Sequence, residues 1–393
     1  MNSIRDYNFQ GKRVLLRCDF NVPIKNGEIL DDFRIKRTLP TISYLKKQGA
    51  KIILLSHLGR PQKFSASGKS RLQEFTLLPV AKKLEELLRE KVKFSKKIVG
   101  WRVKKEVKKL KVGEILLLEN LRFEKGEEEN DEKFAKALAE LGDVYVSEAF
   151  SVCHRSHASI VSLPKLLPHF AGFELEKEIE VLSQVIQNPP SPLVVIIGGV
   201  KIDTKIKIIE KFLEIADHLL FGGQIANVIL RVKGICVGKP WPKEEIVEKL
   251  KKIELTSPKI HLPVDVLASP DESGEIYIRE TGPGSVRTDE EIFDIGKETI
   301  QSFGEIIKSA KSVFWSGPLG LFENDKFAKG TKEIGEIIAK NYEAFKVAGG
   351  GDTILALKKF DLLDKFSFIS TGGGAMLAFL AGEKLPGIEV LKT

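Results

Sequence analysis

Short apolar runs recur along the whole chain, and each ends in a cluster of polar, charged or glycine residues. The nine runs are residues 14–16, 52–55, 115–118, 144–146, 194–197, 219–220, 313–315, 346–348 and 366–369. Such runs are typical of buried parallel strands. Between them lie amphipathic stretches of helical length, at residues 77–90, 131–141, 205–215, 243–252, 289–302 and 329–341. The alternation predicts an α/β fold with right-handed crossovers.

The residues that follow these runs differ between the two halves of the chain. Those in the first half are rich in Arg and His, whereas those in the second half are rich in Gly. Ligands of α/β sheets bind beyond the carboxyl ends of the strands. We therefore predict two sites, one for a small polyanion and one for a phosphate-bearing nucleotide.

The length of 393 residues is natural for two domains rather than one core. A proline-rich segment at residues 188–192 cannot continue a helix and is the predicted boundary. Just before it, Leu175, Ile179, Leu182 and Ile186 have the spacing of an amphipathic helix. We predict two doubly wound (Rossmann-like) parallel-sheet domains, residues 1–172 and 189–379, joined by a hinge helix over residues 173–188.

Composition excludes several classes of protein. No apolar run approaches the roughly 18–20 residues that a membrane span needs. The N-terminus lacks the apolar region of a signal peptide, so we expect a cytoplasmic protein with no membrane partner. The three cysteines, Cys18, Cys153 and Cys236, are odd in number and widely spaced. This pattern argues against a disulfide framework.

The net charge of +8 raises the question of a nucleic-acid partner. Much of the lysine excess lies at residues 82–97 and 104–111, where it alternates with Leu and Val at helical spacing, as on a solvated helix face. Aromatic side chains are not interleaved with these basic residues as base stacking requires. The prediction is a solvated surface and no nucleic-acid partner.

Arginines cluster after the predicted strands of the first half, together with one histidine. They are Arg17, Arg34, Arg60, Arg122 and Arg155, with His57. A guanidinium group is a rigid fork of donors suited to carboxylate and phosphate, so several together suit a ligand with more than one negative group. For any one arginine alone, a surface ion pair is the better interpretation.

Two glycine turns of the second half carry polar side chains. Residues 198–205 place glycines and then Lys201 and Lys205 where a strand becomes a helix, a position that favours phosphate. Residues 349–353 combine glycines with Asp352, a hard oxygen ligand for Mg²⁺, and Thr353. The alternatives are a tight turn with solvated lysines in the first case and a helix N-cap in the second.

Taken in order, these junctions resemble the motif set of the phosphoglycerate kinase family. The matching motifs are residues 17–23, 56–60, 118–123, 154–159, 198–205, 222–227, 315–323, 349–353 and 370–374, and residues 262–266 and 384–387 fit as well. The resemblance covers essentially the whole chain. It implies two doubly wound domains joined by a helix, a C-terminal tail at residues 380–393 that returns to the N-terminal domain, and a monomer.

The resemblance also implies an activity: reversible phosphoryl transfer between 1,3-bisphosphoglycerate with MgADP and 3-phosphoglycerate with MgATP, in glycolysis and gluconeogenesis. On the matching positions, 3-phosphoglycerate is held by Asp19, Asn21, Arg34, His57, Arg60, Arg122 and Arg155. The nucleotide is bound by Lys201, Lys205, Glu323, Gly350, Gly351, Asp352 and Thr353, and Asp352 binds the Mg²⁺.

The chemistry expected of this reaction needs no protein base, since the attacking oxygen is already ionised. Transfer then depends on positioning and charge stabilisation. Arg34 and Lys205 are expected to flank the transferring phosphoryl group, with backbone N–H groups near Gly350 and Gly351 completing the cradle. Because the two sites lie on different domains, we expect hinge closure that expels water.

The sequence departs from the family pattern at residues 147–153 and 280–283, and at Val200, Ser316 and Ala378. None of these departures removes a charged residue assigned to catalysis. The alternative function is a catalytically degenerate relative that serves as a nucleotide-binding module. Retention of Arg34, Lys205 and Asp352 favours the enzyme. A kinase for another small molecule and a nucleic-acid-binding role are the weaker alternatives.

Overall fold

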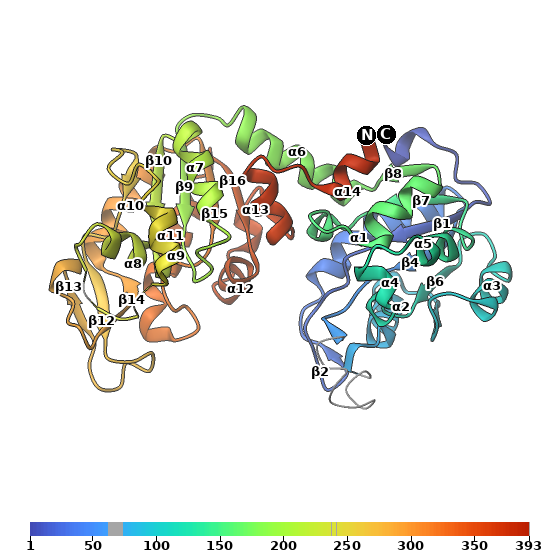
Figure 1. The fold of residues 1–393 in the computed structure, drawn as a ribbon, viewed down its shortest axis with the longest axis horizontal. Helices are drawn as coiled ribbons and strands as arrows, with labels where there is room; N and C mark the ends of the chain where they lie inside the picture. Colours follow the sequence, from blue (N-terminus) through green and yellow to red (C-terminus); the bar gives the residue numbers. More distant parts are fainter. Residues whose placement is uncertain (62–73, 237, 241, 393) are drawn as a thin grey trace. The chain divides into compact units, whose positions relative to one another are not determined.

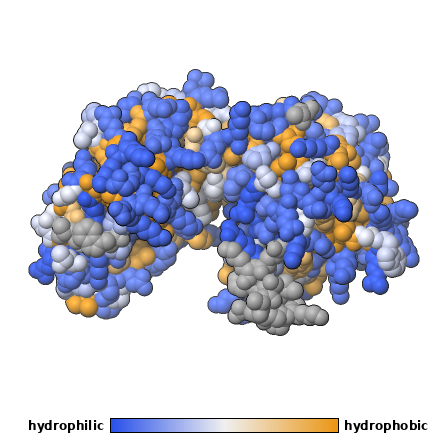
Figure 2. Space-filling model, in the orientation of Figure 1, coloured by the Kyte–Doolittle hydropathy of each residue, from blue (hydrophilic) through white to orange (hydrophobic). Residues whose placement is uncertain are grey.

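The computed structural model describes residues 1–61, 74–236, 238–240 and 242–392 (Figure 1). The chain divides into two compact units. Unit 1 contains residues 1–180 and 384–393, and unit 2 contains residues 181–383. The division falls within helix α6 (Phe173–Gln187), which covers most of the segment predicted as the linking helix. Hydrophilic residues cover most of the visible face of both units (Figure 2).

Unit 1 is built on a parallel six-stranded sheet of order β5-β6-β4-β1-β7-β8. Its strands are β1 (Arg13–Arg17), β4 (Lys51–Leu55), β5 (Val92–Ser95), β6 (Ile115–Leu118), β7 (Val144–Ser147) and β8 (His169–Ala171). The four central strands are almost wholly buried, as their continuous apolar runs require.

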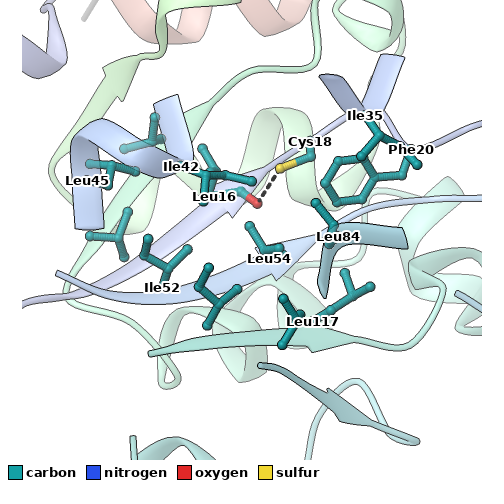
Figure 3. Packing of buried hydrophobic residues seen from close by; sticks show 14 of the residues in the cluster. Leu16, Cys18, Phe20, Ile35, Ile42, Leu45, Ile52, Leu54, Leu84 and Leu117 are labelled. Atoms are coloured by element: carbon teal, nitrogen blue, oxygen red, sulfur yellow. Dashed lines mark hydrogen bonds between the residues drawn. The ribbon is translucent and has the colours of Figure 1, made fainter. Parts of the chain in front are cut away.

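Most helices of unit 1 bury apolar residues, and two of these helices were predicted from the sequence pattern. The helices are α1 (Phe33–Lys47), α2 (Leu78–Leu88), α3 (Trp101–Lys108), α4 (Lys125–Glu128), α5 (Glu132–Ala139) and the C-terminal α14 (Pro386–Glu389). The helices predicted over 77–90 and 131–141 correspond to α2 and α5. Ile42 and Leu45 of α1 and Leu84 of α2 pack with Leu16 and Leu54 of the sheet in one cluster (Figure 3).

Unit 2 contains a parallel six-stranded sheet of order β11-β10-β9-β15-β16-β17. Its strands are β9 (Leu193–Ile197), β10 (His218–Phe221), β11 (Ile260–His261), β15 (Ser312–Ser316), β16 (Phe345–Gly349) and β17 (Phe368–Ser370). In chain order this arrangement is the 3-2-1-4-5-6 order of a doubly wound sheet, whose direction of winding reverses between β9 and β15. The fold-class prediction is confirmed by these two parallel sheets.

The helices of unit 2 are α7 (Ile206–Ile215), α8 (Gly223–Val232), α9 (Glu244–Leu250), α10 (Lys297–Ser309), α11 (Lys329–Lys340), α12 (Gly351–Lys359) and α13 (Gly374–Leu380). Those predicted over 205–215, 243–252 and 329–341 correspond to α7, α9 and α11. The helix predicted over 289–302 is wrong in its first half, where β14 (Glu291–Ile295) forms instead and α10 begins only at Lys297.

The error at residues 289–302 has a tertiary cause. Strand β14 pairs in antiparallel fashion with β12 (Val266–Ser269), which also pairs with β13 (Arg279–Thr281) in a separate three-stranded sheet. Side chains in β14 alternate in burial, with Ile292 and Asp294 buried. Pairing with a strand some 25 residues earlier decided the conformation of residues 291–295. The spacing of apolar residues within this segment does not reveal such a partner.

Candidate active site

In unit 1 the four arginine- and histidine-bearing junctions follow four neighbouring strands. The sheet places β6, β4, β1 and β7 side by side in parallel, so their carboxyl ends meet at one edge. The loops there carry Arg122 after β6, His57 and Arg60 after β4, Asp19 and Asn21 after β1, and Arg155 after β7. The topology therefore brings the predicted polyanion residues to one edge of the sheet. This edge includes the point between β1 and β7 at which the winding of the sheet reverses.

A buried arginine anchors this edge. Arg17, the last residue of β1, is fully buried, and its Nε donates to Ser159 Oγ at 2.9 Å. Its Nη2 lies 3.3 Å from His57 Nδ1 and 3.9 Å from the buried carboxylate of Glu127. Because a guanidinium can only donate, His57 Nδ1 accepts and the neutral ring carries its proton on Nε2.

The electrostatic surroundings keep His57 neutral. Burial lowers its pKa well below the usual value, and the positive charges of Arg17, Arg122, Arg34 and Arg155 lower it further. His57 is thus surrounded by four guanidinium groups and contributes a hydrogen-bonding ring rather than a fifth charge.

A second group of contacts joins β1, α1 and the loop after β7. The carboxylate of Asp19 accepts a hydrogen bond from Arg34 of α1, and its Oδ2 also accepts from Ser151 Oγ at 2.5 Å. Asn21 Oδ1 accepts the backbone N–H of Gly59 at 2.9 Å, which ties the loop after β1 to the loop after β4. Asp19 and Asn21 therefore hold loops and a side chain in place.

Two arginines of this edge have nitrogen atoms without hydrogen-bond partners among the described residues. Arg122 donates from Nη1 to the carbonyl of Gly59 at 2.5 Å, and its Nε lies 3.3 Å from Glu128. Arg122 Nη2 and Arg155 Nε are buried with no hydrogen-bond partner among the described residues. Burial and the neighbouring arginine lower the pKa of Arg122 to about 10. Buried donors of this kind call for an anionic acceptor.

Arg60 and Asn21 are exposed, whereas the other predicted residues of this edge are buried or half-buried. Arg60 is close enough to Arg155 that its charge lowers the pKa of Arg155. The structure thus places all seven predicted polyanion residues, Asp19, Asn21, Arg34, His57, Arg60, Arg122 and Arg155, on the loops of one sheet edge or on the adjoining start of α1.

In unit 2 the glycine turns meet where the winding of the sheet reverses. Gly198 and Gly199 follow β9, and Gly317 follows the neighbouring β15. The backbone N–H of Gly199 donates to the carbonyl of Pro318 at 2.7 Å. A Cβ at Gly317, whose φ is +97°, would lie 2.2 Å from the carbonyl oxygen of Gly198. Only glycine permits these two turns to approach so closely.

Lys205 lies beneath these turns. Its side chain is buried, and Nζ donates to the carbonyl of Gly198 and, at 3.2 Å, to the carbonyl of Ser316. Burial lowers the pKa of Lys205 to about 8, while the carboxylate of Asp352 opposes that effect. A cation is therefore held at the reversal point by backbone carbonyls and by one nearby carboxylate.

The turn after β16 is the second predicted phosphate turn. Gly350 has φ of +103° and precedes Gly351, the first residue of α12. Thr353 Oγ1 accepts the backbone N–H of Gly317 at 2.7 Å and donates to the carbonyl of Gly349 at 3.0 Å. Thr353 is thus a buried link between β15 and β16.

A cavity of about 810 Å³ opens in unit 2 beside these turns. Of the predicted nucleotide residues, Lys201, Glu323 and Asp352 line it; Lys205, Gly350, Gly351 and Thr353 do not. The three lining side chains are exposed. The opposite wall comes from β14 and from the segment after β12, through Glu291, Phe293, Pro270 and Glu272. Cavities of this size accommodate molecules as large as a nucleotide.

Sequence reasoning missed the residues that complete both sites. Ser151, Ser159 and Glu127 support the polyanion edge, and Gln224 and Glu291 meet across the cavity wall in a hydrogen bond. Gln224 directly follows the glycine pair after β10, which is the one local signal that could have identified it. The others are adjacent only through strand and helix packing.

The metal prediction rests on Asp352 alone. Among the described residues there is no group of three or more His, Cys, Asp or Glu side chains that could hold an ion. A single exposed carboxylate beside a cavity fits Mg²⁺, because this ion keeps several waters and is commonly bound by one or two carboxylates plus substrate phosphates.

No helix in the described ranges has both the length and the apolar character to span a membrane.

Fold and geometry together define a class of protein: a two-unit α/β protein with an arginine-rich sheet edge on one unit and a cavity beside glycine turns on the other. The family model for phosphoglycerate kinase matches residues 4–383. A phosphoglycerate kinase from Borrelia hermsii is 44% identical over 397 aligned positions, covering 100% of this chain and 99% of that protein. The chain belongs to the phosphoglycerate kinase family and is a kinase.

Solved structures agree. The phosphoglycerate kinase of Coxiella burnetii is 38% identical with a TM-score of 0.85, covering 99% of this chain and 98% of that one. The enzyme of Pyrococcus horikoshii OT3 is 36% identical with a TM-score of 0.86, covering 100% and 98%.

Proposed function

We propose that the protein transfers a phosphoryl group between ATP and the carboxylate of 3-phosphoglycerate, reversibly, with Mg²⁺. The observation that carries this proposal most strongly is the gathering of unpaired guanidinium donors on one unit and of a buried lysine beside glycine turns on the other. The guanidinium donors suit a ligand with two negative groups, and the lysine beside glycine turns suits a polyphosphate ligand.

The acceptor, 3-phosphoglycerate, binds at the polyanion edge of unit 1 in this proposal. Arg122 and Arg155 face its phosphate with the nitrogen atoms that have no hydrogen-bond partner in the described part of the chain. Asp19, Asn21, Arg34, His57 and Arg60 complete the site. Neutral His57, with its proton on Nε2, donates a hydrogen bond to an oxygen of the ligand.

The nucleotide occupies the cavity of unit 2. The family resemblance assigns Lys201 to the phosphates, Glu323 to the ribose and Asp352 to the Mg²⁺, and all three line the same cavity. The backbone N–H groups at Gly350, Gly351 and the start of α12 are oriented for a phosphate, because the first turn of a helix leaves them without partners. Thr353 contributes as a buried link that holds this turn against β15.

In the transfer itself, a carboxylate oxygen of 3-phosphoglycerate attacks the γ-phosphorus of ATP, and the bond from that phosphorus to the bridging oxygen breaks. ADP leaves and the acyl phosphate forms; the reverse sequence makes ATP. The attacking oxygen is ionised, so no protein base is needed. Arg34 and Lys205 stabilise the charge on the transferring group. Bound Mg²⁺ neutralises phosphate charge.

The kinase is tested by ATP consumption that depends on 3-phosphoglycerate and Mg²⁺, coupled to reduction of the acyl phosphate. We expect turnover in the native protein and its loss in Arg34→Ala. The matched control is Arg13→Ala, at the amino end of β1, where the arginine pairs with Asp143. Unaltered turnover in Arg34→Ala would contradict the assigned role.

The alternative is a degenerate relative that binds nucleotide without catalysis. It predicts MgADP binding by calorimetry with no turnover under any substrate condition. The same preparations, examined by sedimentation, test the proposal that the enzyme works as a monomer.

A further inference from the structure

The positive charge of the protein is concentrated in one segment of unit 1. Residues 91–113 contain ten basic residues and a single acidic one, Glu106, which gives a net charge of +9 against +8 for the whole chain. The other 370 residues together therefore carry a net charge of −1. So uneven a distribution gives one part of the surface a strongly positive electrostatic potential.

The structure places this segment on β5, α3 and the loops around them, at the rim of unit 1 (Figure 1). Val103 and Val107 of α3 and Leu110 after it are buried. The outward face of α3 carries Trp101 and its basic residues. Trp101, Lys105 and Lys108 are spaced four and three residues apart, so they lie along one stripe of the helix, about 10 Å from end to end.

Most of these basic groups are not neutralised. Lys93 pairs with Glu114 and Lys104 with Glu140, each at 2.5 Å. The remaining eight are exposed, and within the described ranges none forms an ion pair: Lys91, Lys96, Lys97, Arg102, Lys105, Lys108, Lys109 and Lys111. Their charge is available to a partner.

An aromatic ring lies among them. Trp101 is 69% exposed, and the guanidinium of Arg102 lies 5.3 Å from its ring centroid. Trp101 falls between the two lysine-rich stretches in which the sequence pattern gave no stacking aromatic. The structure thus supplies the element that the charge pattern lacked: a π-face presented to solvent beside cations.

We propose that this surface, defined by Trp101, Arg102, Lys105, Lys108 and Lys109, binds single-stranded nucleic acid. Its lysines meet the phosphates and a base stacks on Trp101. Single strands fit because stacking needs an unpaired base, which a duplex does not offer to a flat helical surface. The activity is separate from phosphoryl transfer, since none of these residues belongs to the sites described above.

An anionic membrane is the competing partner, and the structure disfavours it. A helix that lies in a membrane interface inserts an apolar face. The apolar residues of α3, Val103 and Val107, are buried in the unit and are not available for insertion. Trp101 is the only apolar residue among the five that define this surface, and Val112, at 50% exposed, is the only other large exposed apolar residue of segment 91–113.

The test is fluorescence anisotropy of a labelled oligothymidylate of about 12 nucleotides with the full-length protein at several salt concentrations. We expect saturable binding whose log–log salt slope corresponds to about three to five phosphates. Trp101→Ala should weaken binding about tenfold. K105Q/K108Q should weaken it and reduce the salt slope by about 1.4.

Matched controls come from unit 2. Tyr342 is 85% exposed with Lys346 Nζ 5.9 Å from its ring, so Tyr342→Ala removes a comparable aromatic. Lys329 and Lys332 of α11 have the same spacing as Lys105 and Lys108, so K329Q/K332Q removes equal charge. Both controls should bind as the native protein does, and 3-phosphoglycerate-dependent turnover should be unchanged in all four variants.

The outcomes separate the possibilities. A second probe is a strand of equal length without bases. Its affinity for the native protein should be as low as the affinity of the oligothymidylate for Trp101→Ala. Equal affinity for the strands with and without bases would overturn the proposal, because the surface would then be a simple polyanion exchanger. Binding to vesicles of anionic lipid that depends on Trp101, with no binding to the oligonucleotide, would overturn it in favour of a membrane.

Discussion

At the scale of single residues, Lys205 is a cation that unit 2 holds away from solvent beside its glycine turns. Only 6% of the residue is exposed, and two backbone carbonyls accept its hydrogen bonds. In the proposed reaction, a charge fixed in this way is oriented before transfer begins and stabilises the transition state without further reorganisation.

Replacing this lysine should therefore affect chemistry more than acceptor binding. We expect Lys205→Ala to lower kcat about 10²–10³-fold while the KM for 3-phosphoglycerate changes little. Steady-state kinetics measures both constants. Lys207→Ala is the control, because Lys207 lies two residues along on α7 and pairs with Glu383 at the surface. Parallel losses in kcat and in 3-phosphoglycerate binding would refute this role.

The same lysine predicts a pH dependence of nucleotide binding. Its pKa of about 8 means that the cation is present below that pH and is lost as the pH rises through it. We expect the affinity for MgADP to fall across this range, because a neutral amine no longer attracts phosphate. Titration calorimetry on either side of pH 8 measures the effect, which Lys205→Arg should abolish since arginine stays charged.

At the scale of elements, helix α6 is anchored at its first turn by a buried carboxylate from the loop after β7. Glu148 accepts the backbone N–H groups of Glu174 at 2.9 Å and Leu175 at 3.1 Å. Burial raises the pKa of Glu148 to about 8 despite these bonds. Because the division between the units falls within α6, Glu148 fixes the start of the segment that joins them.

Glu148→Ala should leave two N–H groups without an acceptor and lower the free energy of unfolding by about 1–3 kcal/mol. Glu148→Gln keeps one acceptor oxygen and should cost less. The contribution of the protonated form is complete below the unfolded pKa, near 4.5, and is lost as pH rises through the folded pKa of about 8. Urea unfolding at several pH values should thus show the native protein losing stability relative to Glu148→Gln as pH rises. A constant difference would contradict the shift.

At the scale of the whole molecule, the chain crosses between the units twice and ends in unit 1. The terminal residues Leu385, Ile388, Val390 and Leu391 are buried there, and the N–H of Gly387 donates to the carbonyl of Cys153 at 2.9 Å. The last ten residues therefore complete the core of unit 1 although they follow unit 2 in sequence.

Deleting residues 384–393 should destabilise unit 1, because each buried aliphatic side chain contributes about 1.5–3 kcal/mol. We expect an unfolding transition at least about 5 °C lower, with the affinity of unit 2 for MgADP unchanged. Scanning calorimetry and nucleotide titration measure the two. Lys392→Ala, which removes only an exposed partner of Glu389, is the control. A transition at the native temperature would show that the tail is dispensable.

The proposed reaction, with one ligand bound to each unit, requires the two ligands to come into contact. We expect small-angle scattering to change when 3-phosphoglycerate and a non-hydrolysable ATP analogue are both bound, since direct transfer needs water excluded around the joined substrates. Either ligand alone should change the profile less. An unchanged profile with both ligands bound would argue against closure about α6.

Much of this protein could be predicted from local sequence. Buried parallel strands are continuous apolar runs, and the residue after each run is at the carboxyl end whatever the strand order. For that reason Asp19, His57, Arg122, Gly198 and Gly349 could be placed at strand ends without a structure. The family resemblance added roles to these positions, and the comparisons confirm the family.

Other features depended on partners distant in sequence. The strand β14 was expected as a helix because its partner β12 lies outside any local window. The Asp19–Ser151 hydrogen bond and the cavity wall formed by Glu291 join residues far apart along the chain. The hydrogen bond from buried Lys205 to the carbonyl of Ser316 likewise joins residues far apart along the chain.

The sequence by itself determined most of the parallel strands, most of the helices and the polar residues that follow the strands, because periodicities and turn residues act over a few positions. An exception is β14, whose conformation depends on its pairing with β12. Only the tertiary structure decided which ends meet and which charges are buried. It also decided that Trp101 faces solvent beside unpaired lysines. The physical reason is that burial and pairing are set by packing between distant segments, and free energies of desolvation change with that packing rather than with local sequence.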